Sequence, residues 1–213
     1  MFSLSILSYS QEILWQDLRV DKNLTVSLPG NVNKIDTFYF LQGKKTNFKM
    51  FIAQTEFSAI GVVASNEFDA NINNKETLEN VLDKVAISAI KKMKEGNMDC
   101  FASDTLLFKK LPCKKIKCFG KKNGNLMHIL LYTIVVNDIV YTMQGAFVPE
   151  LASGGLMEMD RLLKSIKIDI NSIKELEFES KAFSQSYKFG YFIGMLIIPA
   201  IIIGLIIYFV RRK

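Results

Sequence analysis

Residues 126–145 read LMHILLYTIVVNDIVYTMQG, two largely apolar runs separated by Asn137 and Asp138. Two turn-forming residues between runs of this kind are typical of a β-hairpin. A strand with one face in water alternates apolar and polar residues, whereas residues 129–136 are largely apolar on both faces. The sequence therefore predicts an antiparallel hairpin whose first strand lies inside a sheet and is covered on each side.

Further strands are predicted on both sides of a long helix that precedes this hairpin. They are a short strand at Trp15, then residues 24–28, 38–41, 48–52 and 59–64 before the helix, and 100–108 and 112–120 after it. The last two are expected to pair around Lys109 and Lys110. The sheet is therefore predicted to be antiparallel.

Two helices are predicted from apolar residues at a spacing of three and four. The first covers residues 78–93, and lysines followed by Gly96 and Asn97 mark its end. The second covers residues 156–166 after the stretch Ser153-Gly154-Gly155. Together the elements predict one α+β domain over residues 11–170, an antiparallel sheet flanked by helices.

Residues 189–210 form a run of 22 residues without a charged side chain, and they account for much of the positive mean hydropathy of +0.18. A helix of about 20 apolar residues spans a bilayer. We predict a C-terminal transmembrane helix over 189–210, which excludes a purely soluble chain. Ser186, Gly190 and Gly194 form a row of small residues through which two such helices would form a homodimer.

The charges beside this run predict its orientation. Residues 211–213 carry three of the net six positive charges, whereas the juxtamembrane linker 171–188 has three Lys and three Glu. The positive-inside rule places the 211–213 tail in the cytoplasm and the domain outside, at the cytoplasmic membrane of the cell. Residues 1–10, MFSLSILSYS, resemble the end of a signal peptide. The alternative is a tail-anchored protein with its domain in the cytoplasm.

Short sequence motifs in this chain resemble those of a known protein family. Trp15 precedes LTVSLPG at 24–30, which is similar to the "sVsFPg" opening of bacterial PsbP-like proteins. IVYTM at 139–143 and LKSI at 163–166 resemble their "vYtl…fl.Sfk" close. The chain thus resembles the PsbP-like (Mog-like) αβα sandwich superfamily, which includes DcrB-type lipoproteins, over residues 12–168. The resemblance implies an accessory or binding protein, and it transfers no site residue. No lipid-acceptor cysteine stands near the N-terminus, unlike in the lipoproteins.

Three cysteines raise the question of a disulfide. Cys113 and Cys118 are five residues apart on one predicted strand and so lie on opposite faces. Cys100 and Cys118 come close at the open end of the predicted hairpin, where they would form a disulfide. Buried reduced thiols are the alternative, and we favour it.

Seven lysines and no acid lie between residues 109 and 122: Lys109, Lys110, Lys114, Lys115, Lys117, Lys121 and Lys122. One interpretation is contact with an anionic surface, such as lipid headgroups or an acidic protein. The other, which we favour, is a solvated hairpin whose lysines prevent pairing with other chains. Nucleic acid is not expected as a partner, because charge elsewhere in the domain is nearly balanced.

No catalytic, metal or cofactor signature is present. His128 is the only histidine, and it has no recognisable nucleophile motif beside it. We therefore predict no catalytic residue, no metal site and no cofactor. The predicted function is that of a non-enzymatic binding or accessory module whose partner is a protein or small ligand near the membrane. An enzyme with an unrecognised thiol or hydrolytic site is the less favoured alternative.

Overall fold

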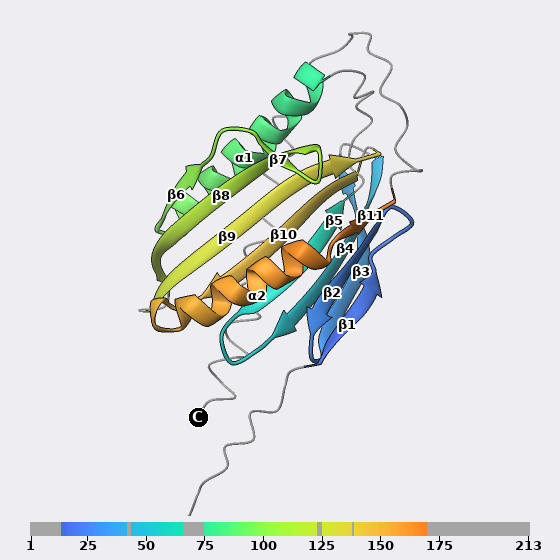
Figure 1. Ribbon diagram of the computed structural model, residues 1–213. Coiled ribbons are helices and arrows are strands. Elements are labelled where there is room, and N and C mark those ends of the chain that lie inside the picture. Colours follow the sequence, from blue (N-terminus) through green and yellow to red (C-terminus); the bar gives the residue numbers. More distant parts are fainter. Residues whose placement is uncertain (1–13, 42–43, 66–74, 123–124, 138, 170–213) are drawn as a thin grey trace, which may run out of the picture.

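The computed structural model describes residues 14–41, 44–65, 75–122, 125–137 and 139–169. In this part of the chain a large antiparallel sheet has the strand order β3-β4-β5-β10-β9-β8-β6, with β7 beside β8 (Figure 1). Its strands are β3 (Val32–Leu41), β4 (Lys44–Gln54), β5 (Ala59–Ser65), β6 (Met98–Ala102), β7 (Leu106–Phe108), β8 (Leu111–Lys122), β9 (Asn125–Val136) and β10 (Ile139–Phe147).

The large sheet has a different cover on each face. Helix α1 (Lys75–Glu95) packs against β6, β8 and β9 on one face. The other face carries α2 (Ala152–Ser165), which follows the short 3-10 helix η1 (Pro149–Leu151), and a small sheet of β1 (Trp15–Arg19), β2 (Leu24–Pro29) and β11 (Lys167–Ile168). Two buried apolar clusters fill the two interfaces. The arrangement is therefore a sheet covered on both sides.

The central hairpin confirms the first prediction. β9 lies between β10 and β8, and Val136 pairs with Ile139 across the turn. Asn137 has a φ of 49°, which suits asparagine better than most residues. The first predicted helix is also confirmed, since α1 ends at Glu95 and Asn97 has a φ of 60°.

The structure corrects other boundaries. The predicted strand 100–108 is two strands, β6 and β7, separated by residues 103–105, where the Ser103 hydroxyl donates to the Asp104 carbonyl. The second helix begins at Ala152, so Gly154 and Gly155 lie inside it rather than before it. The small sheet was not predicted as a sheet, since β11 has only two residues.

The predicted transmembrane helix 189–210 lies outside the described residues, as do residues 1–10, the linker 171–188, the tail 211–213 and the row Ser186, Gly190 and Gly194. Within the described ranges, no helix combines the length and the apolar character needed to cross a bilayer.

Candidate functional site

A groove of about 450 Å³ lies between α2 and the part of the large sheet formed by β8 and β9. Helix α2 runs in front of β10, and β8 lies beyond β9 on the side away from the small sheet (Figure 1). Alternation along β8 and β9 brings Lys115, Lys117, His128 and Tyr132 to this face. The helix contributes Leu156, Met159, Asp160 and Leu163. This volume lies within the range of small-ligand sites.

Close packing of α2 on β10 leaves this space beside it. A Cβ on Gly145 of β10 would lie 3.1 Å from the sulfur of Met159, and one on Gly155 of α2 would lie 2.7 Å from the ring of Phe147. The helix therefore rests directly on β10 at two glycines. Since β8 and β9 receive no such contact from the helix, their side chains line an open groove.

The groove is apolar with cations on one wall. Lys115 places its Nζ 5.0 Å from the centre of the Tyr132 ring, and Lys117 is exposed on the same strand face. The opposite wall contributes one carboxylate, Asp160, which pairs with Lys164 at 2.6 Å. Apart from this paired carboxylate, the charge presented to a ligand is positive.

An exposed apolar rim extends the groove along the sheet edge. The rings of Phe101 and Phe119 stack with their centres 5.7 Å apart, and Phe101 is 60% exposed. Leu156 on α2 is 48% exposed across the groove. Large exposed apolar side chains that gather in one place mark interaction sites more often than isolated ones do.

The lysine-rich stretch divides between the two faces of the sheet. Lys114 lies on the α1 face, where its Nζ pairs with Asp83 at 2.6 Å and the side chain is 10% exposed. Lys109 lies at the end of α2, and its ammonium donates to the backbone carbonyls of Lys164 and Ile166. A cation at a helix C-terminus is stabilising. These two lysines have structural roles.

The remaining lysines are placed differently. Lys115 and Lys117 line the groove, Lys121 is exposed near the end of β8, and Lys110 lies in the turn between β7 and β8. The side chain of Lys122 lies outside the described part of the chain. Of the lysines of this stretch whose side chains are described, Lys115 and Lys117 line the groove.

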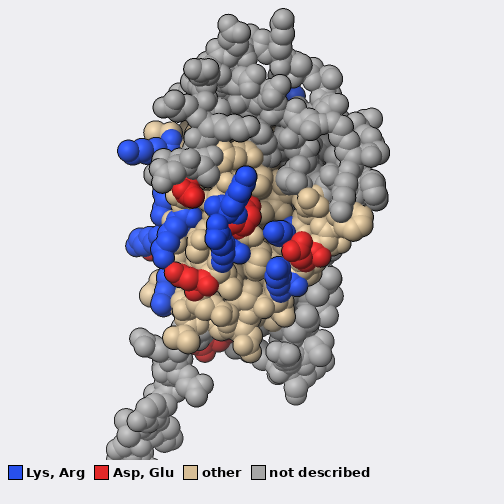
Figure 2. Space-filling model, turned by 90° about the vertical axis from the view of Figure 1, so that its right-hand side faces the viewer, with Lys and Arg blue, Asp and Glu red and all other residues tan. Residues whose placement is uncertain are grey.

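Charges elsewhere are mixed. On the side of the molecule that carries β1 to β3, basic and acidic side chains intermingle (Figure 2). Lys34 pairs with Asp36 at 3.6 Å on β3, and Lys167 pairs with Asp17 at 2.8 Å in the small sheet. Exposed pairs of this kind contribute little to stability and present no large field of one sign.

The β7–β8 turn gives a testable prediction. Lys109 and Lys110 have φ values of 49° and 70°, a backbone conformation that favours glycine or asparagine. Lys110→Gly is expected to raise the free energy of unfolding by about 1 kcal/mol, because it relieves this backbone strain. Urea denaturation measures the change. Lys121→Gly, in regular strand, is the control and should lower stability; equal losses in both variants would contradict the prediction.

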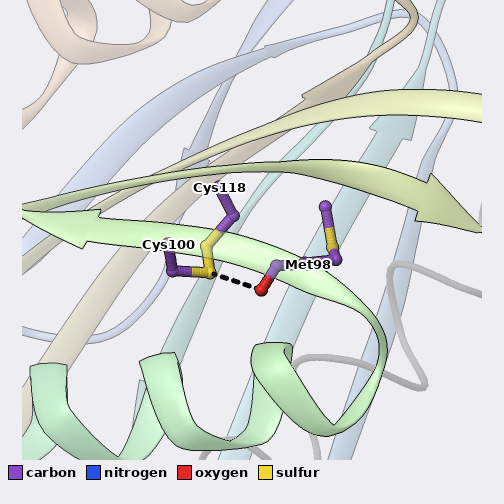
Figure 3. The surroundings of a disulfide bond; sticks show 3 residues. All are labelled: Met98, Cys100 and Cys118. Carbon is purple, nitrogen blue, oxygen red and sulfur yellow. Dashed lines mark hydrogen bonds between the residues drawn. A yellow bond between two sulfur atoms is a disulfide. The ribbon is translucent and has the colours of Figure 1, made fainter.

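The three cysteines have distinct states. Cys100 and Cys118 face each other across β6 and β8 and form a disulfide, with their Cα atoms 4.1 Å apart (Figure 3). The favoured prediction of reduced thiols is therefore wrong for this pair. The Cα separation suits a residue pair without hydrogen bonds between antiparallel strands. Cys113 is a free thiol, 1% exposed on the opposite face, and burial raises its pKa to about 11.

Other titratable groups are tied into the fold. The buried Tyr141 hydroxyl donates to Asp21 at 2.6 Å, and burial raises its pKa far above the usual value. Glu158 accepts hydrogen bonds from Ser58 at 2.5 Å and Thr55 at 2.7 Å, and burial raises its pKa as well. His128 meets the Phe147 ring edge-on at 5.9 Å. No three metal-binding side chains converge in the described ranges.

Comparison with solved structures identifies the architecture. The solution structure of cyanobacterial PsbP (CyanoP) from Synechocystis sp. PCC 6803 matches 78% of this chain and 98% of its own, with a TM-score of 0.52 and 10% identity. The fold is PsbP-like. A protein of unknown function from Pseudomonas aeruginosa, PA94, described as a putative regulator, matches 58% of this chain and 94% of its own, with a TM-score of 0.34 and 14% identity. No family model and no curated protein matches the chain.

The groove of this PsbP-like domain was not predicted. The sequence indicated that Lys115 and Lys117 belong to one strand, and strand alternation puts both on one face. The missing information was the position of α2, which depends on contacts between Gly145, Gly155 and the residues they approach. A helix and a strand that are distant in sequence become two walls of one groove only through that packing.

Proposed function

We propose that this chain is a non-enzymatic binding module whose PsbP-like domain is held at the outer face of the cytoplasmic membrane by residues 189–210. Its groove takes a ligand that joins an acid group to an apolar body. The single observation that carries the binding role is the apolar groove beside α2 with Lys115 and Lys117 on one wall. The acid group would lie against the two lysines, and the apolar body against the side chains of α2 and β9.

The ligand chemistry follows from the lining. Aromatic and aliphatic side chains supply most of the surface, and removing them from water favours an apolar ligand by roughly 25 cal/mol per Å². Two ammonium groups add electrostatic preference for an anion. A free carboxylic acid with a long chain has this chemistry. A segment of a partner protein with alternating acidic and apolar side chains has it too.

The placement outside the cytoplasm is supported by two features. The three cations at 211–213 follow directly on the apolar run, which favours a cytoplasmic tail. The Cys100–Cys118 disulfide is of a kind that persists in oxidising compartments. A tail-anchored domain in the cytoplasm would meet reducing conditions instead, and this is why we propose export.

The non-enzymatic role is supported by the states of the nucleophile candidates. Cys113 is buried with a raised pKa, so little thiolate forms at neutral pH. The other two sulfurs are joined to each other. His128, the histidine of the groove, contacts an aromatic ring rather than a hydroxyl or thiol among the residues described.

The proposal is tested with a fluorescent apolar anion, anilinonaphthalene sulfonate, titrated onto the full chain in detergent. We expect saturable binding that K115E/K117E weakens about tenfold, since two charge interactions at the wall of the groove are reversed. The matched control is K91E/K94E, which makes the same charge change on exposed positions of α1, against the other face of the sheet.

Competition then separates the two ligand sources. Dodecanoate that displaces the probe supports a free carboxylic acid, and a synthetic peptide of alternating glutamate and leucine that displaces it supports a protein segment. Equal affinities of K115E/K117E and K91E/K94E for the probe, or no displacement by either competitor, would show that the groove is not the binding site.

A further inference from the structure

The β3–β4 hairpin extends beyond the rest of the large sheet. Pairing between β4 and β5 ends at Phe48 and Ser65, whereas pairing between β3 and β4 continues to Leu41 and Lys44. Four further residue pairs, from Phe38 with Asn47 to Leu41 with Lys44, therefore form a two-stranded ribbon. At about 3.3 Å per residue, this ribbon is about 13 Å long.

The sequence of the ribbon is rich in aromatic residues and lysines. Residues 38–41 are Phe-Tyr-Phe-Leu, and Lys44 and Lys45 follow on the returning strand. Phe38, at the base of the ribbon, is 51% exposed. The stretch 37–55 contains three lysines and no acid. Aromatic residues beside lysines are the composition of protein segments at the interface between lipid and water.

The ribbon projects from the end of the domain at which the described chain stops. Ser65 pairs with Val140, next to the β9–β10 turn. At that turn the Asn137 side chain donates to Asn23 at 3.0 Å, and the Asn23 carbonyl accepts from the amide of Asp169 at 2.9 Å. Asp169 is the last described residue before the linker and the apolar run. The exit of the chain and the ribbon therefore share one end of the fold.

We propose that this ribbon, residues 38–41 and 44–47, docks on the surface of a bilayer that contains anionic lipids. The inference rests on the membrane anchoring proposed above, because the anchor confines the ribbon near the lipid. A linker of about 18 residues has a root-mean-square span of roughly 20–25 Å, so the surface is within reach. An attachment that is weak by itself then becomes effective, since the second contact is intramolecular.

Docking fixes the orientation of the domain as well as its distance. With the ribbon end against the lipid, the strands of the large sheet run away from the bilayer. The groove lies along β8 and β9, so its open side faces sideways rather than into the membrane. A partner in the same membrane would then reach Lys115 and Lys117 from beside the domain.

The experiment places a tryptophan in the ribbon. Trp15 is the only tryptophan of the chain and pairs with Pro29, at the end of β2 away from Leu24 and Ile168. The full chain carrying W15F and F40W is reconstituted into vesicles of phosphatidylcholine and phosphatidylglycerol with brominated acyl chains. We expect a blue-shifted emission from F40W and loss of its fluorescence by bromine quenching. The unchanged chain, with Trp15 alone, is the matched control and should be quenched less.

Charge reversal tests the lipid preference. K44E/K45E in the W15F/F40W background should reduce quenching in the anionic vesicles to the level seen in pure phosphatidylcholine. Quenching of F40W no greater than that of Trp15, in protein that floats with the vesicles, would overturn this inference alone. Quenching that K44E/K45E leaves unchanged would overturn the requirement for anionic lipid. A chain that does not float with vesicles would overturn the anchoring and this inference together.

Discussion

Replacing Cys100 and Cys118 together by alanine is expected to lower the free energy of unfolding by about 3 kcal/mol. The disulfide closes a loop with a sequence separation of 18, and the loss of unfolded-state entropy in a loop of that length corresponds to about this value. It also fixes β6, an edge strand, to β8. Urea denaturation of oxidised protein at a fixed temperature measures the difference.

Reductant and Cys113 supply the controls. Dithiothreitol should destabilise the unchanged chain and the C113A variant by similar amounts, and it should leave C100A/C118A unaffected. A stability of the unchanged chain that does not depend on reductant would contradict a structural role for the bridge. Alkylation of acid-quenched cells tests the compartment: protection of Cys100 and Cys118 is expected for an exported domain, and full alkylation of both would contradict export.

Gly61→Ala is expected to lower the free energy of unfolding by about 3 kcal/mol, an effect similar in size to that of removing the disulfide. Gly61 lies on β5 opposite Ile52 of β4, and a Cβ there would lie 2.3 Å from the carbonyl oxygen of Phe51. Because the obstacle is backbone, no side-chain rotation relieves the clash, and two central strands must separate. The measurement is thermal and urea unfolding of the purified chain.

Gly96→Ala is the matched control for this change. A Cβ on Gly96, after the end of α1, would come within 3.3 Å of the Met93 carbonyl oxygen only. Both variants gain one methyl group. The difference between their free energies of unfolding therefore measures how closely other atoms approach each Cβ position. Equal stabilities of the two variants would contradict the close approach of β4 and β5 at Gly61.

The sequence predicts those elements whose patterns are local. The 20 residues from Leu126 to Gly145 contain both the apolar runs and the turn residues, and the hairpin β9–β10 follows from them. Helix α1 follows in the same way from its apolar stripe. The break at Ser103 was missed because a hydroxyl that bonds to its own neighbourhood leaves no mark in the apolar pattern.

The groove depends on contacts that no local pattern records. Lys114 and Lys115 are neighbours in the sequence, yet one pairs with Asp83 of α1 and the other lies over Tyr132 in the groove. Strand alternation separates them, but the assignment of each face requires knowing which helix covers it. Similarly, the pairing of Cys100 with Cys118 was one of two alternatives, and only the register of β6 with β8 places them opposite each other.

The small sheet joins the two ends of the domain. β11 pairs Ile168 with Leu24 of β2, so the second and the last strands of the described chain lie side by side. In the exported topology that we propose, the chain crosses the membrane from its N-terminus, and β2 gains its second neighbour, β11, only after almost the whole domain has crossed. Residue 168 crosses only shortly before the apolar run enters the bilayer. In that topology, the small sheet would be completed at about the time when the apolar run reaches the bilayer.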